Sequence, residues 1–280
     1  MLSRIGTRLK GSTMHVSPLT ANSQPAVLAY LRVAPYRNAL PLSNTTQLRS
    51  RCDVLVAEQN GKVVGMASTY HDLPIPNVTF ATRSAPVARA LLHGLAGRNP
   101  HLSEQPTYAL LPQARRDQLA HVAQIIEAPV EYQMAIEPEI LSAAERWPTQ
   151  RLSSADIAEM NELARAAGLS VWHSRALALG PAFGCFVDGR LVAMAATHFA
   201  TADVVEIGHI ATHPDYRRRG YATACTAALT RAAFGLAPRV FLMVMADNTA
   251  ALAAYKKLGF RAIEPFYLTR FLLTRDSEEK

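Results

Sequence analysis

The chain has 280 residues, a formal net charge of +7, an apolar fraction of 49% and a charged fraction of 18%. This composition fits a folded globular protein of about two domains and excludes a disordered one. No run of about eighteen apolar residues is present, so neither a membrane span nor a membrane partner is expected. The basic residues are scattered rather than interleaved with aromatic ones, so a polyanionic small ligand is expected instead of nucleic acid.

The N-terminal segment and the cysteine content predict a cytoplasmic protein. Residues 1–13 lack the long apolar stretch of a secretory signal, and we expect a disordered lead-in there, with Met14 a second candidate start. The three cysteines, Cys52, Cys185 and Cys225, lie far apart in the sequence and lack metal-ligand spacing. We therefore expect reduced core thiols and no metal requirement.

The first half of the chain predicts a helix over 24–33 and then a hairpin that turns at Asn60-Gly61, because both turn residues accept positive φ. Pro138–Pro148 joins this half to the second one. The hairpin is followed, in order, by a strand at 78–82, a helix at about 85–95, a strand at 107–111, a helix at 114–126 and a strand at 130–136.

The second half predicts the same order of elements. A helix over 154–167, capped by Ser153 or Ser154 with Asp156 in its first turn, precedes a hairpin that turns at Asp188-Gly189. The further elements are a strand at 204–212, a helix at 221–234, a strand at 239–246, a helix at 249–258 and a strand at 261–272. The alternation predicts an α/β (α+β) fold in two copies, each a twisted mixed sheet flanked by helices. We place the domains at 14–140 and 141–280.

The sequence Arg217-Arg218-Arg219-Gly220-Tyr221-Ala222 lies where a predicted strand is followed by a predicted helix. The first N–H groups of a helix lack partners within the helix, and the helix dipole adds positive charge there. This basic turn is therefore a candidate phosphate site. The corresponding turn of the first half, Arg83-Ser84-Ala85-Pro86, has no glycine, and Pro86 has no N–H. We expect one active site, with the first copy structural or lining the acceptor pocket.

The turn matches the pattern R/Q-x-x-G-x-G/A through Arg217, Gly220 and Ala222. In this context the chain resembles the GNAT superfamily of acyl-CoA N-acyltransferases, well over 150–272 and more faintly over 14–137. It looks like the two-domain branch that includes glycine N-acyltransferase-like proteins. The resemblance implies acetyl-CoA as co-substrate. It implies that the pantetheine arm pairs with Ile210, Ala211 and Thr212, and that the pyrophosphate lies on the N–H groups from Arg218 through Arg219, Gly220, Tyr221 and Ala222 to Thr223.

The resemblance also implies roles for three further residues. Tyr255, in Tyr255-Lys256-Lys257-Leu258-Gly259-Phe260, would be the general acid that protonates the CoA thiolate; the alternative is a packing tyrosine. Asn248 would contact the pantetheine arm and also cap the next helix. Glu206, eleven residues before Arg217, would be the base that deprotonates the amine; the alternative is a solvated charge at the start of a strand.

Several features of this site remain open in the sequence. Strand alternation places Glu206, Gly208, Ile210 and Thr212 on one face. The base could instead be water or one of four histidines, His173, His198, His209 and His213. The family's oxyanion donor would be an N–H near Ile210. Direct transfer is expected, since Cys225 lies inside a helix, away from the strand ends.

Acceptor-pocket walls are expected at about 168–182 and 197–204, with Trp172-His173 as candidates, and Trp147 is interpreted as an interdomain anchor. The primary hypothesis is direct N-acetylation of an amine on a small molecule or a protein. One alternative is a non-catalytic acyl-CoA-binding or regulatory protein. The other is a tandem transferase that uses aminoacyl-tRNA, which would need a long basic surface.

Overall fold

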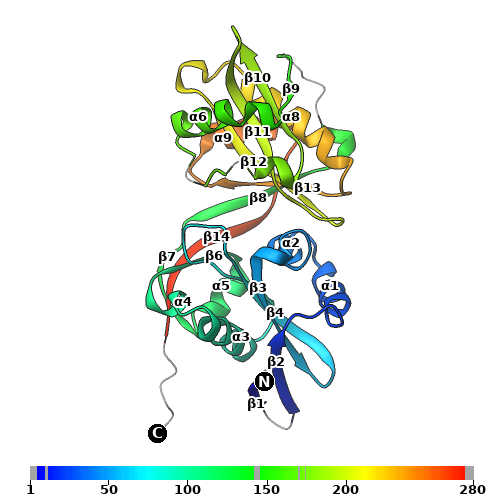
Figure 1. Cartoon of the computed structure of the whole chain (residues 1–280), viewed down its shortest axis with the longest axis vertical. Coiled ribbons are helices and arrows are strands. Elements are labelled where there is room, and N and C mark those ends of the chain that lie inside the picture. Colours follow the sequence, from blue (N-terminus) through cyan, green and yellow to red (C-terminus); the bar gives the residue numbers. More distant parts are fainter. Residues whose placement is uncertain (1–4, 10–11, 142–145, 170, 174, 275–280) are drawn as a thin grey trace. The chain divides into compact units, whose positions relative to one another are not determined.

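The computed structural model describes residues 5–9, 12–141, 146–169, 171–173 and 175–274 (Figure 1). The chain forms two compact units. One comprises Met1–Glu131 together with Pro265–Lys280, and the other comprises Tyr132–Glu264. No helix among the described residues is long and apolar enough to cross a membrane.

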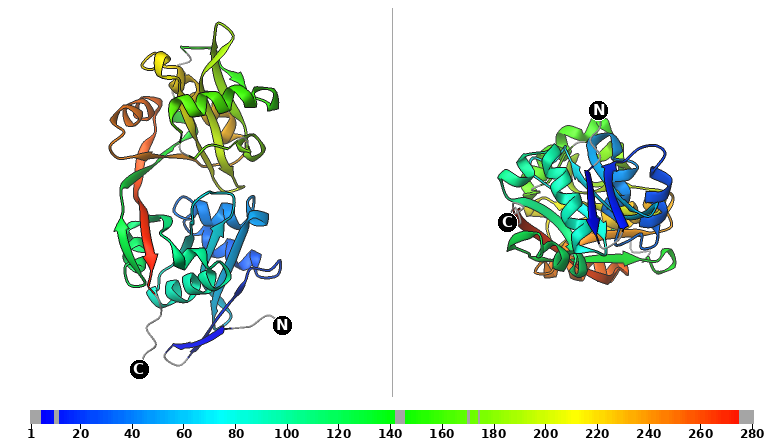
Figure 2. Two further views of the ribbon diagram at one scale, coloured as in Figure 1. Left: turned by 60° about the vertical axis from the view of Figure 1, so that its left-hand side comes forward. Right: turned by 90° about the horizontal axis from the view of Figure 1, so that it is seen from below.

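The first unit contains a five-stranded antiparallel sheet in the order β1-β2-β3-β4-β5. The β3–β4 hairpin turns at Asn60-Gly61, where φ is 52° and 72°, as predicted. The sheet strands are β1 (Ile5–Leu9), β2 (Ser12–Pro18), β3 (Cys52–Gln59), β4 (Lys62–Tyr70) and β5 (Thr79–Thr82). β1 and β2 form the dark blue hairpin of Figure 2 and lie in or overlap the segment 1–13, where disorder was expected.

Helices and a second group of strands complete the first unit. The helices are α1 (Gln24–Arg32), α2 (Ala39–Thr45), α3 (Ala85–Arg98), α4 (His101–Glu104) and α5 (Gln113–Leu119), with one 3-10 turn, η1 (Arg49–Arg51). The remaining strands are β6 (Thr107–Pro112), β7 (Ala123–Glu127) and the end of β14 (Arg261–Leu273). β14 pairs antiparallel with both β6 and β7, and Figure 2 shows red β14 beside green β7.

The predicted helix over 114–126 is wrong in its second half. α5 ends at Leu119, and Ala123–Glu127 is strand β7. Strand β7 pairs antiparallel with β14, with Glu127 opposite Arg270 and Ala123 opposite Leu273. Such pairing with a segment about 150 positions away overrides a weak local helix preference.

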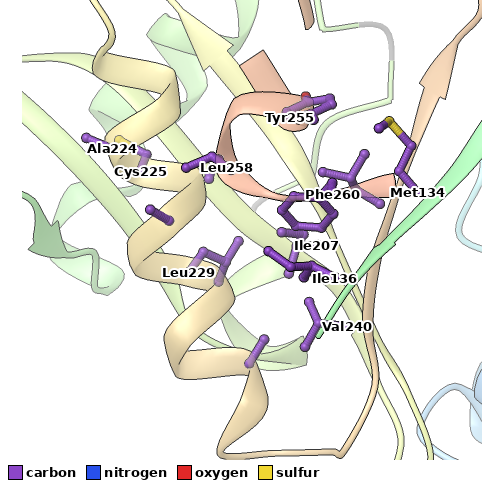
Figure 3. Packing of buried hydrophobic residues seen from close by; sticks show 14 of the residues in the cluster. Met134, Ile136, Ile207, Ala224, Cys225, Leu229, Val240, Tyr255, Leu258 and Phe260 are labelled. Atoms are coloured by element: carbon purple, nitrogen blue, oxygen red, sulfur yellow. The ribbon is translucent and has the colours of Figure 1, made fainter. Parts of the chain in front are cut away.

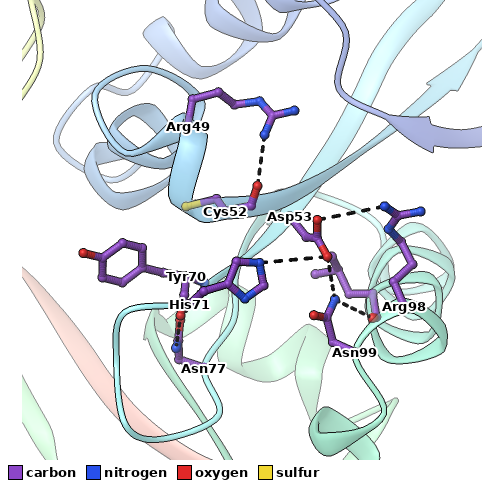
Figure 4. Close-up of polar contacts among 9 residues, drawn as sticks. Arg49, Cys52, Asp53, Tyr70, His71, Asn77, Arg98 and Asn99 are labelled. Atoms are coloured by element: carbon purple, nitrogen blue, oxygen red, sulfur yellow. Dashed lines mark hydrogen bonds and ion pairs between the residues drawn. The ribbon is translucent and has the colours of Figure 1, made fainter.

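Polar contacts in the first unit join the start of β3 to the end of α3 (Figure 4). The Asn99 side-chain amide donates to Asp53 Oδ2 at 3.0 Å. Arg98 and His71 lie 3.9 and 4.0 Å from the same carboxylate. Asn99 is the C-cap residue of α3 and also donates to the Leu95 carbonyl, so these contacts fix a helix end and are structural.

The second unit contains strands in the order β9-β10-β11-β12-β13-β8. β10 and β11 form the second predicted hairpin, with φ of 50° and 77° at Asp188-Gly189. The strands are β8 (Val130–Ile136), β9 (Gln150–Arg151), β10 (Ala182–Val187), β11 (Arg190–Ala200), β12 (Val205–Thr212) and β13 (Val240–Met245). The helices are α6 (Ile157–Ala167), α7 (Ala176–Leu179), α8 (Tyr221–Phe234) and α9 (Thr249–Leu258), and the 3-10 turns are η2 (Pro138–Ile140), η3 (Ser154–Asp156) and η4 (Pro214–Tyr216).

Two apolar clusters cover opposite faces of this sheet. Met160 and Leu163 of α6 pack with Met194 of β11 and Ala211 of β12. The other cluster contains α8, α9 and their strand partners (Figure 3), including Ile207, Ala224, Leu229, Val240, Leu258 and Phe260. The capping of α6 is as expected, because Ser153 and Asp156 form a capping box at η3, which leads into the helix.

The last strand of each repeat belongs mainly to the unit built by the other repeat. Residues 132–136 of β8 fall in the second unit, where Met134 and Ile136 are buried with α8 and β13. Residues 265–273 of β14 fall in the first unit, where Phe271 and Leu273 are buried with β3 and α3. The compact units therefore do not follow a division at 140/141.

Candidate functional site

The basic turn lies between the end of β12 and the start of α8. The short helix η4 leads into it, and Arg217 is extended. Arg218 and Gly220 have φ of 62° and 92°, a left-handed conformation that only glycine adopts without cost. Arg217 Nε donates to the Thr212 carbonyl at 3.4 Å, and Arg219 Nη2 donates to the Asp215 carbonyl at 3.2 Å. These bonds shape the turn, while all three arginines stay exposed.

The first turn of α8 presents backbone N–H groups. Gly220 is the N-cap residue and provides no side chain that could accept from them. The first i to i−4 bond is donated by Ala224 to the Gly220 carbonyl at 3.1 Å. The N–H groups of Tyr221, Ala222 and Thr223 precede this bond and lie at the positive end of the helix dipole. The geometry suits an anion, as the sequence predicts.

Trp147 supports this turn from outside the predicted motif. Its Nε1–H donates to the Arg219 carbonyl at 2.7 Å, and its ring centroid lies 4.5 Å from that of Tyr221. A Cβ at position 220 would lie 3.8 Å from Trp147 Nε1. These contacts lie within the second unit, so the interpretation of Trp147 as an interdomain anchor is replaced by a role in holding the turn. The sequence carried no signal for this contact across 72 positions.

Under the acyl-CoA hypothesis drawn from the sequence, Gly220→Ala is expected to raise the KM for acyl-CoA about tenfold, since relaxing φ from 92° would rotate the N–H groups away from the anion. Gly189→Ala is the matched control, because its φ is 77° and a Cβ there meets nothing within 4 Å. Both variants should lose about 1–2 kcal/mol of folding free energy. Steady-state kinetics and thermal unfolding measure the two effects, and an equal KM in both variants would contradict the anion role.

β12 and β13 diverge immediately beyond their first residues. Their parallel register contains Val205↔Val240 and Glu206↔Phe241, whereas β12 continues to Thr212 and β13 to Met245. Between diverging strands, backbone groups can pair with an extended ligand as they would with another strand. Glu206 lies at the point of divergence. Ile210, Ala211 and Thr212, the predicted pantetheine residues, lie farther along β12.

Two β-bulges lie beside this divergence and change the direction of two histidine side chains. Between β11 and β12, Thr197 pairs with Ile207 and Phe199 with Glu206, so His198 is an extra residue on β11. Gly208 pairs with Ala196 and Ala211 with Met194, so β12 carries an extra residue at His209 or Ile210. His209 has φ of 45°. Bulges redirect side chains, and here the His198 and His209 ring centroids lie 4.1 Å apart.

The bulge on β12 corrects the predicted side-chain alternation. Ile207 is buried in the α8 cluster, and Ile210 packs against the same cluster. Strict alternation would place these two residues on opposite faces. The extra residue reverses the alternation between them. The prediction that Ile210 lies on the same face of the sheet as Glu206 is therefore wrong. Period-two patterns carry no signal for a bulge.

Glu206 is buried, with 5% of its surface exposed, which excludes the solvated charge considered from the sequence. Its Oε1 lies 2.8 Å from His198 Nδ1. An ionised carboxylate only accepts hydrogen bonds, so Nδ1 carries the proton and donates it. His198 is much more accessible, with 36% of its side chain exposed against 7% for Glu206.

Two aromatic side chains of a loop pack against the His209 ring. Trp172 and His173 lie edge-on to its ring at centroid distances of 5.1 and 5.8 Å. Burial, followed by the nearby His198 and His173, lowers the pKa of His209 to about 2. The His209 side chain is therefore uncharged at neutral pH. His213 lies apart from this group, with its ring atoms 3.1 Å from Arg190 and 3.6 Å from Asp215.

Tyr255 lies in α9, with 9% of its surface exposed, and packs in the α8 cluster near Leu258 and Phe260 (Figure 3). Burial raises its pKa to about 12, so its hydroxyl keeps the proton at neutral pH. Both sequence interpretations, a packing residue and a general acid, are compatible with this environment. Asn248 caps α9, as predicted, by accepting from the Ala251 N–H at 3.2 Å.

The structure brings together two cysteines that are distant in the sequence. Cys185 of β10 and Cys225 of α8 are free thiols with sulfur atoms 3.5 Å apart, and both are buried. Cys225 lies in the second turn of α8 and is enclosed in the core, so it does not face the divergence between β12 and β13. Among the described residues, no group of three or more His, Cys, Asp or Glu side chains is arranged to hold a metal ion.

Comparison with known proteins identifies similar domains and folds. The Acetyltransferase (GNAT) family model matches residues 142–260. No curated protein sequence matches the chain significantly. Solved structures match it over most of its length.

A tandem GNAT protein from the clavulanic acid biosynthesis pathway is 14% identical, with a TM-score of 0.65, covering 95% of this chain and 100% of the other. A GCN5-related N-acetyltransferase from Sphaerobacter thermophilus is 16% identical, with a TM-score of 0.64 and coverage of 93% and 96%. A GNAT-family acetyltransferase from Colwellia psychrerythraea is 13% identical, with a TM-score of 0.59 and coverage of 91% and 99%. At these identities the similarity establishes the fold.

Proposed function

We propose that this chain, which has the two-domain GNAT fold and carries a GNAT acetyltransferase domain over residues 142–260, transfers an acetyl group from acetyl-CoA to an amine. The family supports acyl transfer from acyl-CoA; the acetyl donor and the amine acceptor are the proposed refinements. One observation carries the proposal. The divergence of β12 and β13 at Glu206 leads along β12 to an uncapped helix N-terminus in a basic turn.

The donor would bind along β12. The pyrophosphate would accept from the N–H groups between Arg218 and Thr223, with arginine side chains adding charge. The pantetheine arm would pair with Ile210, Ala211 and Thr212 in the manner of an added strand. Asn248, at the start of α9, would border the arm on the β13 side. The thioester would then lie near the divergence, where an N–H near Ile210 would stabilise the oxyanion.

The chemistry requires one proton acceptor and one proton donor. A primary ammonium has a pKa of about 10 and is not a nucleophile until it loses a proton. Glu206 supplies negative charge at the divergence, where that proton would leave. The neutral amine attacks the thioester carbonyl, and the C–S bond breaks as the amide forms. Tyr255, which burial keeps protonated, would protonate the thiolate.

Release of free CoA from acetyl-CoA, measured with a panel of small amines and lysine-containing peptides, tests the proposal. We expect release that depends on both the amine and the protein. The same assay with propionyl-CoA and longer acyl-CoAs defines the donor. Saturable acetyl-CoA binding without turnover across the panel would favour a regulatory acyl-CoA-binding protein. Transfer from aminoacyl-tRNA in place of acetyl-CoA would favour the third hypothesis.

A further inference from the structure

We propose that His198 is the residue that takes the proton from the acceptor amine, and that Glu206 is a positioning residue that orients the His198 ring. This inference rests on the proposed function and deepens it. The sequence resemblance assigns the base to Glu206, whereas the structure has a more exposed imidazole in contact with that buried carboxylate.

The orientation of the His198 ring is the first argument. The Nδ1–H donates to Glu206 Oε1 at 2.8 Å, so the opposite ring nitrogen, Nε2, carries the lone pair when the ring is neutral. Nε2 lies against the β12 backbone. A Cβ added to Gly208 would come within 2.6 Å of His198 Nε2 and 2.7 Å of its Cε1. The free nitrogen therefore lies next to Gly208, two residues beyond the divergence at Glu206.

Access is the second argument. Only 7% of the Glu206 side chain is exposed, and one of its oxygens is engaged by Nδ1, whereas 36% of the His198 side chain is exposed. An ammonium group that arrives from solvent meets the imidazole before the carboxylate. An imidazole also titrates near neutral pH, which suits a base that must release its proton to water after each turnover.

The titratable groups around this ring are one carboxylate and two histidines. Glu206 and His209 of β12 face His198, and His173 of the 171–173 segment reaches it through His209. Burial keeps His209 neutral, with a pKa of about 2, so it adds no positive charge beside an imidazolium. Glu206 is the charged partner in contact with the ring, and its sign stabilises the imidazolium formed during the reaction.

The proton balance of the reaction is complete with these residues. The ammonium R–NH₃⁺ gives one proton to His198 Nε2, which becomes imidazolium, and the amine lone pair forms the C–N bond. The C–S bond breaks, and the thiolate takes the Tyr255 proton. The nitrogen loses its second proton, which restores the Tyr255 phenol. The imidazolium then releases its proton to water, so one proton is released per amide formed.

His198→Gln is expected to lower kcat at least 100-fold, with little change in the KM for acetyl-CoA. The ionisation of the proton-accepting group should disappear from the kcat/KM pH profile. Added imidazole should restore part of the rate in His198→Ala, which leaves room for it. Glu206→Gln should lose only about tenfold, because it weakens the contact that orients the ring and leaves the imidazole in place. His71→Gln, which alters a histidine beside Asp53 in the first unit, is the matched control and should leave the kinetics unchanged.

An independent measurement needs no substrate. Nitrogen-15 NMR of the free protein should show His198 at high pH as the tautomer protonated at Nδ1, and this preference should weaken in Glu206→Gln. An Nε2-protonated ring would overturn the inference. So would an active wild type whose His198→Gln variant keeps its kcat while Glu206→Gln loses it. A wild type that releases no CoA with any amine would overturn the proposed function itself.

Discussion

Replacing Tyr255 by phenylalanine is expected to lower kcat about 10²–10⁴-fold while the KM for acetyl-CoA stays within about threefold of wild type. The substitution removes only the hydroxyl and retains the ring that packs near Leu258 and Phe260. A CoA thiolate that leaves without receiving a proton is a poorer leaving group, so the loss should appear in kcat. Stopped-flow or steady-state CoA release measures it.

Tyr132→Phe is the matched control, because Tyr132 packs against the same cluster from β8. It should leave kcat near wild type. Because burial raises the pKa of Tyr255 to about 12, the rate should show no decline from ionisation of this acid until pH approaches that value. Unchanged turnover in Tyr255→Phe would leave the residue only its packing role.

The second large effect concerns two fragments of the chain. The fragment 132–264 contains one whole compact unit, whereas the fragment 141–280 omits β8. We expect cooperative thermal unfolding for 132–264 and none, or aggregation, for 141–280. The measurement is circular dichroism during heating, together with size-exclusion chromatography of each fragment.

The physical reason is the exchange of final strands. The fragment 141–280 lacks Met134 and Ile136, which are 0% and 3% exposed in the α8 cluster. Deleting such side chains costs about 2–5 kcal/mol each, against a total stability of about 5–15 kcal/mol. It also retains Phe271 and Leu273, which pack in the first unit, and leaves the β13 edge unpaired. Equal stability of the two fragments would contradict this account.

Local chemistry made much of the second unit predictable. Asp188-Gly189 and Gly259 adopt the positive φ that their turn and helix end require, and α8 and α9 have the predicted bounds. The basic turn was predictable because helix termini and glycine conformations depend on a few neighbouring residues. The prediction of a helix over 114–126 was wrong in its second half, because the distant strand β14 pairs with that part of the backbone.

The candidate base was predictable only in part. Spacing and resemblance singled out Glu206, and the residue lies at the divergence of β12 and β13. His198 and His209 carried no pairing signal, because the two bulges that turn their rings toward each other leave no trace in period-two alternation. Trp147 was visible as a residue, but its bond to the Arg219 carbonyl depends on a chain approach that no local pattern encodes.

By itself, then, the sequence determined the repeat, its α/β architecture and the basic turn that is the candidate phosphate site, since turns, caps and periodicity are set by residues close together in the chain. Only the tertiary structure decided which unit the last strand of each repeat completes and which histidine contacts the Glu206 carboxylate. It also brought the Cys185 and Cys225 sulfur atoms to 3.5 Å. These features arise from contacts between distant segments, where packing and hydrogen bonding select one partner among many with similar local preferences.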